Sequence, residues 1–245
     1  MTELANKRIA LVTGANKGIG YETARQLANQ GLTVLLGARD AQRGQDAAAK
    51  LQGEGLDVQF LQLDVNDPAT YQTARRFIED NFGKLDVLVN NAGIALDLAQ
   101  KPSEVDGQTL RKTFDVNFFG TIAITQTLLP LIRKSDAGRI VNVSSGLGSL
   151  TQHSDPSWEF YSVKLLAYNA SKTALNAFTV MLAHELKDTS IKVNSADPGF
   201  TATDLNGHRG YKTVEQGASV ITQLATLPAD GATGSYFDDQ GVLPW

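Results

Sequence analysis

The stretch RIALVTGANKGIGYETARQLANQG (residues 8–31) decides the fold. A short apolar run leads into a loop with glycines at 14, 18 and 20, and helical spacing then continues to a stop at Gly31. Such a loop lets the backbone approach a pyrophosphate, and the N-terminus of the following helix attracts anions. The spacing G-x-x-x-G-x-G is neither the common dinucleotide fingerprint nor a phosphate loop ending in G-K-[ST], so a plain strand–helix turn remains an alternative.

Similar apolar runs recur along the chain and alternate with helical stretches. One helix is expected over 68–83, opened by Asp67-Pro68 and closed by Gly83. This alternation predicts an α/β fold: a single Rossmann-like, doubly wound domain over residues 1–245, with a mostly seven-stranded parallel sheet and helices on both faces. Ligands of such sheets bind outside the carboxyl ends of the strands. The runs read as strand plus following loop are 8–14, 33–39, 58–65, 85–93, 138–145, 191–199 and 234–239.

The composition narrows the class of protein. The formal net charge is −4, so nothing global indicates a nucleic-acid partner or an anionic membrane surface. The chain has no cysteine, which excludes disulfides and thiolate chemistry. No apolar stretch approaches the roughly 18 residues of a membrane span, and the N-terminus does not resemble a signal peptide. We therefore expect a cytoplasmic protein, without a membrane partner and, from the spacing of its histidines, without a metal.

The residues after the second expected strand bear on the choice of dinucleotide. A cofactor without a 2′-phosphate would meet an acidic residue there, whereas this chain places Arg39 at that point. Arg39 and Lys17 are able to pair with a 2′-phosphate. Asp40 is a candidate ribose acceptor, but its position favours a helix N-cap. The alternative is that these cations are solvated surface residues.

Polar residues also follow the third and fourth expected strands. Asp64 and Val65 are placed to contact an adenine edge and face, and the small residues of Asn90-Asn91-Ala92-Gly93 leave room for a flat ligand. Asparagine side chains in such a turn can tie neighbouring loops together. Each of these loops, taken alone, is also explained by turn chemistry.

Several short motifs occur together in a familiar order. They are TGANKGIG (13–20), NNAG (90–93), Asn117 within VNFFGT, GRIVNVSS (138–145), YNASK (168–172) and PGFTAT (198–203). Over essentially its whole length the chain resembles the short-chain dehydrogenase/reductase family, and within it the NADPH-dependent carbonyl reductases. The resemblance implies NADPH or NADP as cofactor and a small carbonyl compound as substrate.

Two tyrosines lie close together in EFYSVKLLAYNASK (159–172), and helical geometry separates them. Tyr168 and Lys172 are at i and i+4, so they share one helix face, whereas Tyr161 has Lys164 only at i+3. Hydride transfer to a carbonyl leaves charge on oxygen, and an acid must supply a proton there. A nearby ammonium is expected to lower the pKa of a phenol toward the working range. We therefore assign Tyr168 as the acid and expect hydrophobic packing for Tyr161, with substrate contact as the alternative.

The resemblance assigns the remaining roles. Ser145 orients the substrate oxygen, Lys172 also binds the nicotinamide ribose, and Asn117 supports a proton path; with Tyr168 these are the predicted catalytic residues. Thr203 matches the motif of a nicotinamide carboxamide ligand more closely than Thr201. The predicted cofactor-binding residues are Gly14, Asn16, Lys17, Gly18, Ile19, Gly20, Arg39, Asp64, Val65, Asn91, Ala92, Gly93, Tyr168, Lys172, Pro198, Gly199, Thr201 and Thr203.

Two segments are expected to shape substrate binding: an insertion over about 147–163 and a small loop over about 199–212. Relatives with an insertion at this place include monomeric carbonyl reductases, which favours a monomer over a dimer. The function that these features indicate is NADPH-dependent reduction of aldehydes or ketones to alcohols. The alternatives are NAD-dependent oxidation of secondary alcohols and a catalytically silent NADPH-binding regulator.

Overall fold

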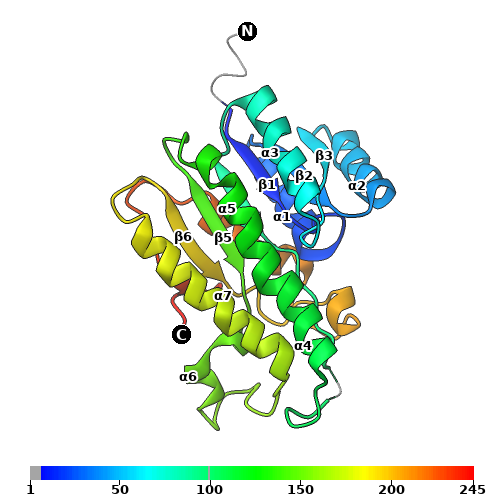
Figure 1. The fold of residues 1–245 in the computed structure, drawn as a ribbon, viewed down its shortest axis with the longest axis vertical. Coiled ribbons are helices and arrows are strands. Elements are labelled where there is room, and N and C mark those ends of the chain that lie inside the picture. Colours follow the sequence, from blue (N-terminus) through cyan, green and yellow to red (C-terminus); the bar gives the residue numbers. More distant parts are fainter. Residues whose placement is uncertain (1–6, 99) are drawn as a thin grey trace.

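The computed structural model describes residues 7–98 and 100–245. Its sheet has seven parallel strands in the order β3-β2-β1-β4-β5-β6-β7, which confirms the predicted doubly wound α/β fold (Figure 1). β1 pairs with β2 on one side and with β4 on the other, so the strand order reverses at β1. The strands are β1 Ile9–Val12, β2 Thr33–Ala38, β3 Val58–Gln62, β4 Val87–Asn90, β5 Arg139–Val143, β6 Lys192–Ala196 and β7 Tyr236–Phe237.

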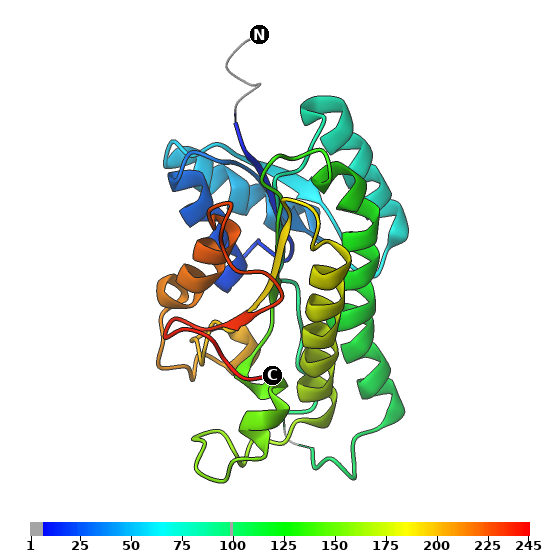
Figure 2. The same cartoon turned by 90° about the vertical axis from the view of Figure 1, so that its left-hand side faces the viewer.

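Helices cover both faces of the sheet, as the edge-on view shows (Figure 2). Buried residues of α1, α2 and α8 belong to the core on one face, and those of α3, α5 and α7 to the core on the other. The helices are α1 Gly18–Asn29, α2 Ala41–Gly53, α3 Pro68–Phe82, α4 Gly107–Phe114, α5 Thr121–Ile132, α6 Leu150–His153, α7 Leu166–Glu185 and α8 Val214–Ala225.

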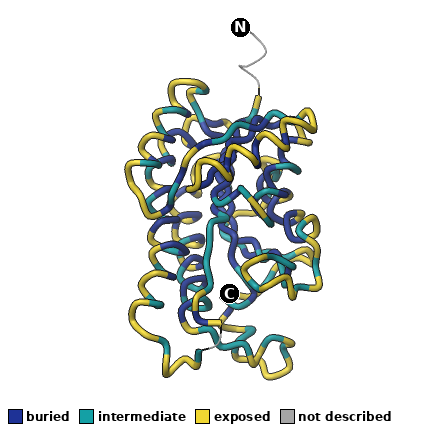
Figure 3. The backbone as a smooth tube through the Cα atoms, turned by 90° about the vertical axis from the view of Figure 1, so that its right-hand side faces the viewer, coloured by how far each residue is buried: buried dark blue, intermediate teal, exposed yellow. Residues whose placement is uncertain are grey.

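The strands supply the middle of both cores. Side chains alternate along a strand, so Ala10 and Val12 of β1 face one core while Ile9 and Leu11 face the other. Buried residues therefore lie through the centre of the molecule, and exposed residues lie around its outside, on the outer sides of helices and in loops (Figure 3). This arrangement explains why the strands read as continuous apolar runs rather than as alternating ones.

Several helices begin and end at the capping residues that the sequence predicts. The Asp67 side chain accepts a hydrogen bond from the Ala69 N–H at 3.0 Å, and Gly83 ends α3 with a left-handed φ of 73°. Asp40 accepts from the Arg43 N–H at 2.9 Å. Its predicted role as the N-cap of α2 is confirmed.

One run of 26 residues, Gly107–Ile132, is long and apolar enough to span a membrane by length and composition alone. It joins α4 and α5 through a π-helical turn, Asp115–Gly120, and packs beside α3 and α7. Its apolar side chains Ile124 and Leu128 are fully buried in the core. The apolar character of this run is thus accounted for by its place inside the fold.

Candidate active site

The glycine loop after β1 lies directly against the loop after β4. Gly14 has a φ of 63°, and a Cβ there would lie 2.9 Å from the Ala92 Cα, so the two loops meet with no room for a side chain. The Asn91 amide donates to the Thr13 carbonyl at 2.9 Å and to the Gly14 carbonyl at 3.2 Å. The prediction that an asparagine of this turn ties neighbouring loops together is confirmed.

The same loop opens α1 and exposes its first turn. Gly18 has a φ of 59°, and a Cβ on Gly20 would clash with the Asn91 amide, so both positions require glycine. Half-buried Asn16 and Ile19 complete the loop. Lys17 occupies the N-cap position, and its ammonium forms an ion pair with Asp204 from the loop after β6. A cradle of glycine backbone at a helix N-terminus suits a pyrophosphate.

Three further predicted residues lie along the same edge of the sheet, toward β3. Arg39 follows β2 directly and is exposed. Asp64 follows β3 and accepts from the Asn66 N–H at 3.0 Å, while Val65 is buried. The carbonyl of Val65 faces Gly120, where a Cβ would lie 2.5 Å away. These residues are separated from Tyr168 by the width of several strands, an arrangement that suits an extended ligand.

Helix α7 and the end of β5 bring three of the four predicted catalytic residues together. The buried Lys172 ammonium lies 5.7 Å from the centre of the Tyr168 ring and donates to the Val143 carbonyl at 2.8 Å. Ser145 and Tyr168 line the same cavity, and the Ser145 side chain is near enough to lower the pKa of the Tyr168 phenol. The i and i+4 spacing thus places both side chains on the face of α7 that meets the sheet.

The pKa of Tyr168 differs from the prediction made from spacing. Desolvation by the surrounding protein raises it to about 12, although the Ser145 side chain lowers it; Asp197 raises it further. Burial lowers the pKa of Lys172 to about 8. The prediction that Lys172 lowers the pKa of the phenol is wrong for this structure, because the ammonium bonds the Val143 carbonyl and desolvation dominates. A phenol with this pKa keeps its proton at neutral pH.

Asn117, the fourth predicted catalytic residue, sits in the π-helical turn. Its carbonyl oxygen accepts from the Ile94 N–H at 2.9 Å, and its amide donates to the Ile94 carbonyl at 2.9 Å and to the Ser171 hydroxyl at 3.0 Å. A Cβ on Gly93 would lie 3.5 Å from both the Asn117 side-chain oxygen and the Lys172 ammonium. Asn117 therefore binds the loop after β4 to α7 beside Lys172. Short π-helical turns of this kind are frequent at functional sites.

The loop after β6 folds back over the glycine loop. Pro198 is buried, and Gly199 follows it with a φ of 70°. The buried Thr201 hydroxyl donates to the Pro198 carbonyl at 3.0 Å. The Thr203 methyl lies 3.7 Å from the position of a Cβ on Gly18, so Thr203 rather than Thr201 faces the glycine loop.

A cavity of about 720 Å³ opens beside Tyr168 and Ser145. Four of its aromatic side chains, Trp158, Phe160, Phe200 and Tyr211, form an aromatic wall. Their successive ring centres are 5.6, 5.8 and 6.0 Å apart, each pair in an edge-to-face arrangement. The wall connects the insertion with the loop after β6. Residues Asp238, Asp239 and Gln240 also line the cavity, and no sequence motif predicts their place there.

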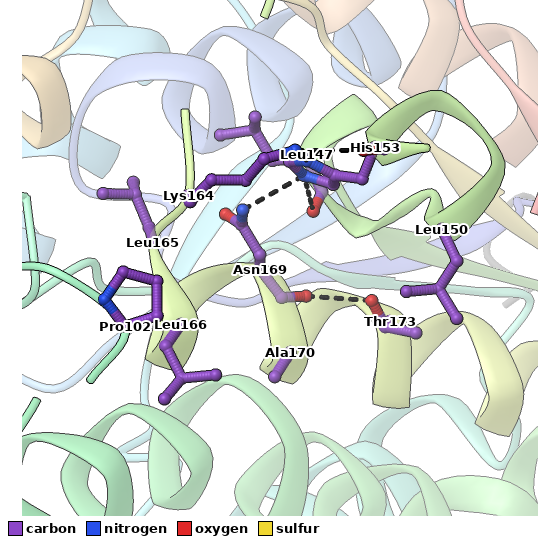
Figure 4. A pocket seen from close by; sticks show the side chains of 10 residues that line it. All are labelled: Pro102, Leu147, Leu150, His153, Lys164, Leu165, Leu166, Asn169, Ala170 and Thr173. Carbon is purple, nitrogen blue, oxygen red and sulfur yellow. Dashed lines mark hydrogen bonds between the residues drawn. The ribbon is translucent and has the colours of Figure 1, made fainter. Parts of the chain in front are cut away.

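A smaller hollow of about 240 Å³ lies behind the start of α7 (Figure 4). There the Lys164 ammonium lies 3.0 Å from His153 Nδ1, and the Asn169 amide lies 3.0 Å from His153 Nε2. Burial and the Lys164 charge lower the pKa of His153. These contacts anchor the insertion on α7. Tyr161 is exposed, with the Lys164 ammonium 4.2 Å above its ring, so the prediction of hydrophobic packing for Tyr161 is wrong.

Asp97 positions the catalytic helix and was missed from the sequence. Leu165 occupies the N-cap position of α7 and has no side-chain oxygen to offer. The fully buried Asp97 supplies one instead: its Oδ2 accepts from the Ala167 N–H at 2.7 Å. Ala167 directly precedes Tyr168, so this bond fixes the turn that carries the acid. Asp97 lies 70 residues away along the chain, which is why no local pattern reveals the contact.

The comparison with protein families fits this geometry. Residues 8–213 match the family model described as short chain dehydrogenase. The chain belongs to the short-chain dehydrogenase family. It is therefore an oxidoreductase of a family that binds a nicotinamide cofactor.

Individual members of the short-chain dehydrogenase family are similar over the full chain. Short-chain dehydrogenase/reductase 1 of Saponaria officinalis is 36% identical over 99% of this chain and 97% of its own length. Carbonyl reductase [NADPH] 1 of Mus musculus is 34% identical, over 98% and 99%. The solved structure of NADPH-bound carbonyl reductase from chicken fatty liver superposes with a TM-score of 0.85 at 26% identity, covering 98% of this chain and 99% of that one.

Removal of the Asp97 cap is expected to destabilise the protein. Asp97→Ala leaves the Ala167 N–H buried without an acceptor, which costs about 1–3 kcal/mol of unfolding free energy. Asp97→Asn keeps an acceptor oxygen and should lose less. The measurement is urea denaturation of both variants beside Asp106→Ala, which removes the exposed N-cap of α4 and should cost about 1 kcal/mol. Equal stability of Asp97→Ala and wild type would contradict the assigned role.

Proposed function

We propose that the protein reduces aldehyde and ketone carbonyls to alcohols with NADPH, using Tyr168 as the general acid. The observation that carries the proposal is the Tyr168 phenol: it lines a cavity together with Ser145 and keeps its proton at neutral pH. A protonated group at that place is what an oxygen needs when hydride reaches the adjacent carbon. The carbonyl reductases to which this chain is similar add support, since their names state the same reaction class.

Each residue has a separate part in the proposed reaction. NADPH, when bound, supplies the hydride. The Ser145 hydroxyl donates a hydrogen bond to the carbonyl oxygen and holds it beside the Tyr168 phenol, which gives up its proton. The buried Lys172 ammonium lies beside Tyr168 on the same face of α7, where its charge is placed to bind the nicotinamide ribose. Asn117 holds the loop after β4 against α7 by its bonds to Ile94 and Ser171, next to Lys172.

The surroundings of the glycine loop support a dinucleotide with a 2′-phosphate. Cβ atoms at Gly14 or Gly20 would fill the space beside Asn91 and Ala92, so a close backbone cradle is built into the loop. Asp40 is the acidic residue that could accept a hydrogen bond from a ribose hydroxyl, but one of its carboxylate oxygens already caps α2. Arg39 is exposed at the tip of β2, where a guanidinium can bind a phosphate in a bidentate manner.

Oxidation of alcohols with NAD uses the same residues but requires Tyr168 as a base. A phenol with a pKa of about 12 is almost entirely protonated at neutral pH and is therefore poorly suited to act as that base. The silent-regulator alternative requires a defective site, whereas Ser145, Tyr168 and Lys172 are all present and adjacent.

Tyr168→Phe removes the proton donor and leaves the ring in place. The rate of NADPH consumption with aldehydes and ketones should fall by about 10²–10⁴. Tyr161→Phe is the matched control, because it removes the same hydroxyl from an exposed ring. Its turnover should stay within about twofold of the wild-type value. Near-wild-type turnover by Tyr168→Phe would refute the assignment.

Arg39→Ala tests the cofactor. Loss of a guanidinium–phosphate contact should weaken NADPH binding by about tenfold or more, and NADH binding should change little. Arg43→Ala, on the first turn of α2 and 3.9 Å from Asp40, removes an exposed arginine close by and serves as control. Fluorescence titration of both nucleotides gives the values. Equal losses for NADH and NADPH in Arg39→Ala would exclude 2′-phosphate recognition.

The pH dependence of carbonyl reduction should follow the protonation of Lys172. Its pKa is lowered to about 8 by burial, so its charge is fully present below that pH and is lost as the pH rises through 8. Reduction should therefore be constant in weakly acidic and neutral solution and decline above pH 8, as measured by kcat/KM for a carbonyl substrate at saturating NADPH. A decline centred near the ordinary lysine value of 10.5 would show that burial does not govern this group.

A further inference from the structure

A carboxylate with no part in the proposed proton transfer lies in the cavity beside Tyr168. Asp197 follows β6 directly, and its side chain accepts from the Gly199 N–H at 2.9 Å and from the Gly146 N–H. Its own N–H donates to the Phe237 carbonyl at 2.7 Å. The Gly199 N–H thus holds a half-buried carboxyl that lines the cavity, and the bond to Phe237 fixes the backbone of Asp197.

Charged and titratable groups face Asp197 from each neighbouring element. Tyr168 and Lys172 of α7 lie within its electrostatic reach, as do Tyr236 of β7, Asp238 beyond it, and Tyr211 and Lys212 before α8. The two ammonium groups among them have other partners: Lys212 bonds Asp239 Oδ1 at 2.8 Å and Lys172 bonds the Val143 carbonyl. Asp197 is therefore not neutralised by a direct ion pair with either of them.

The whole lining of the cavity is richer in acid than in base. Four carboxylates line it against two cations, Arg209 and Lys212. Arg209 is exposed, and its guanidinium donates to the Asn206 carbonyl at 2.9 Å. The four carboxylates are Glu159, Asp197, Asp238 and Asp239.

The aromatic wall supplies the other half of the recognition surface. Edge-to-face rings offer an apolar surface of ring faces and edges against which an aromatic substrate body can pack, and their faces also attract cations. Asp197 is close to the reacting atoms, while Glu159 lies at the exposed rim, where it accepts from the Tyr211 hydroxyl at 3.4 Å. A ligand that meets both features has an aromatic ring, a carbonyl and a positive charge.

We propose that the cavity selects aryl aldehydes and ketones that carry a protonated amine, and that Asp197 binds this amine. The inference rests on the proposed carbonyl reduction and adds the substrate class. The ammonium donates charge-assisted hydrogen bonds to the Asp197 carboxylate, the ring lies along the aromatic wall, and the carbonyl reaches Ser145 and Tyr168.

The preference should depend on pH. Burial raises the pKa of Asp197 to about 6; the N–H groups of Gly199 and Gly146 and the Lys212 charge oppose this, while Asp238 adds to it. The carboxylate is negative above pH 6 and becomes neutral below it. Because an alkyl amine stays protonated up to about pH 10, selection for the amine should be present above pH 6 and disappear below it. Changes at Lys172 affect charged and neutral substrates alike, so they cancel in a ratio.

The test compares two acetophenones that differ in one substituent of similar shape, aminomethyl against ethyl, at each ring position. The measured quantity is the ratio of their kcat/KM values with NADPH. For wild type at pH 7.5 we expect a ratio of about ten or more for at least one ring position, and a fall toward one for Asp197→Asn, since a hydrogen bond to a charged group is worth that much. Glu159→Gln makes the same change of charge at the rim and should keep the ratio. Turnover of the ethyl compound by Asp197→Asn shows that the variant is folded.

The outcomes separate the two proposals. If the ethyl compound is reduced and the wild-type ratio is one or less at every ring position, the amine selection is wrong and carbonyl reduction stands. If a carboxymethyl acetophenone is preferred, the cations Lys212 and Arg209 govern selection and the inference is also overturned. If Glu159→Gln lowers the ratio as much as Asp197→Asn, general charge rather than Asp197 is responsible. If neither acetophenone is reduced, the inference is overturned; if the aldehydes and ketones of the Tyr168→Phe experiment are not reduced either, the proposed function fails with it.

Discussion

The pairing of β1 with both β2 and β4 is the constraint on which the rest of the molecule depends. The chain must cross from the outer strand β3 back to the middle of the sheet, and the loops after β1 and β4 then emerge side by side. Gly14 and Ala92 approach so closely there that a single methyl group on Gly14 would separate the loops. Every loop that carries the candidate site follows a strand of the sheet that is built outward from this pairing.

Desolvation decides the electrostatics of the site. Tyr168, Lys172 and Asp197 each have a pKa shifted toward their neutral form, and burial is the largest cause in all three. The resulting set is a phenol that keeps its proton, an ammonium that is easily discharged and a carboxyl that is easily neutralised. Perturbed groups of this kind gather where a protein performs chemistry rather than where it only packs.

The sequence predicted those features that depend on short spacing. The i and i+4 pair Tyr168 and Lys172, the N-cap Asp40 and the left-handed Gly83 are all visible within a few residues, and the structure places them as expected. Strand–helix alternation likewise predicted the sheet, because it reflects burial on both faces.

Features that depend on contacts between distant segments could not be predicted. Asp97 caps a helix that begins some 70 residues later, and Asp197 meets Gly146 across the sheet edge. The pKa of Tyr168 was predicted in the wrong direction because spacing shows the neighbouring lysine but not the surrounding protein that desolvates the phenol. The carboxylates near the C-terminus belong to the cavity only through the position of β7.

Because of the aromatic wall, substitutions in one of two separate segments affect the packing of the other. The insertion contributes Trp158 and Phe160, the loop after β6 contributes Phe200 and Tyr211, and the two halves meet where Phe160 contacts Phe200. A graft of either segment from a relative would leave one of these rings without its partner, so neither is a self-contained module. New selectivity in this scaffold has to be acquired by paired changes on both sides of that contact.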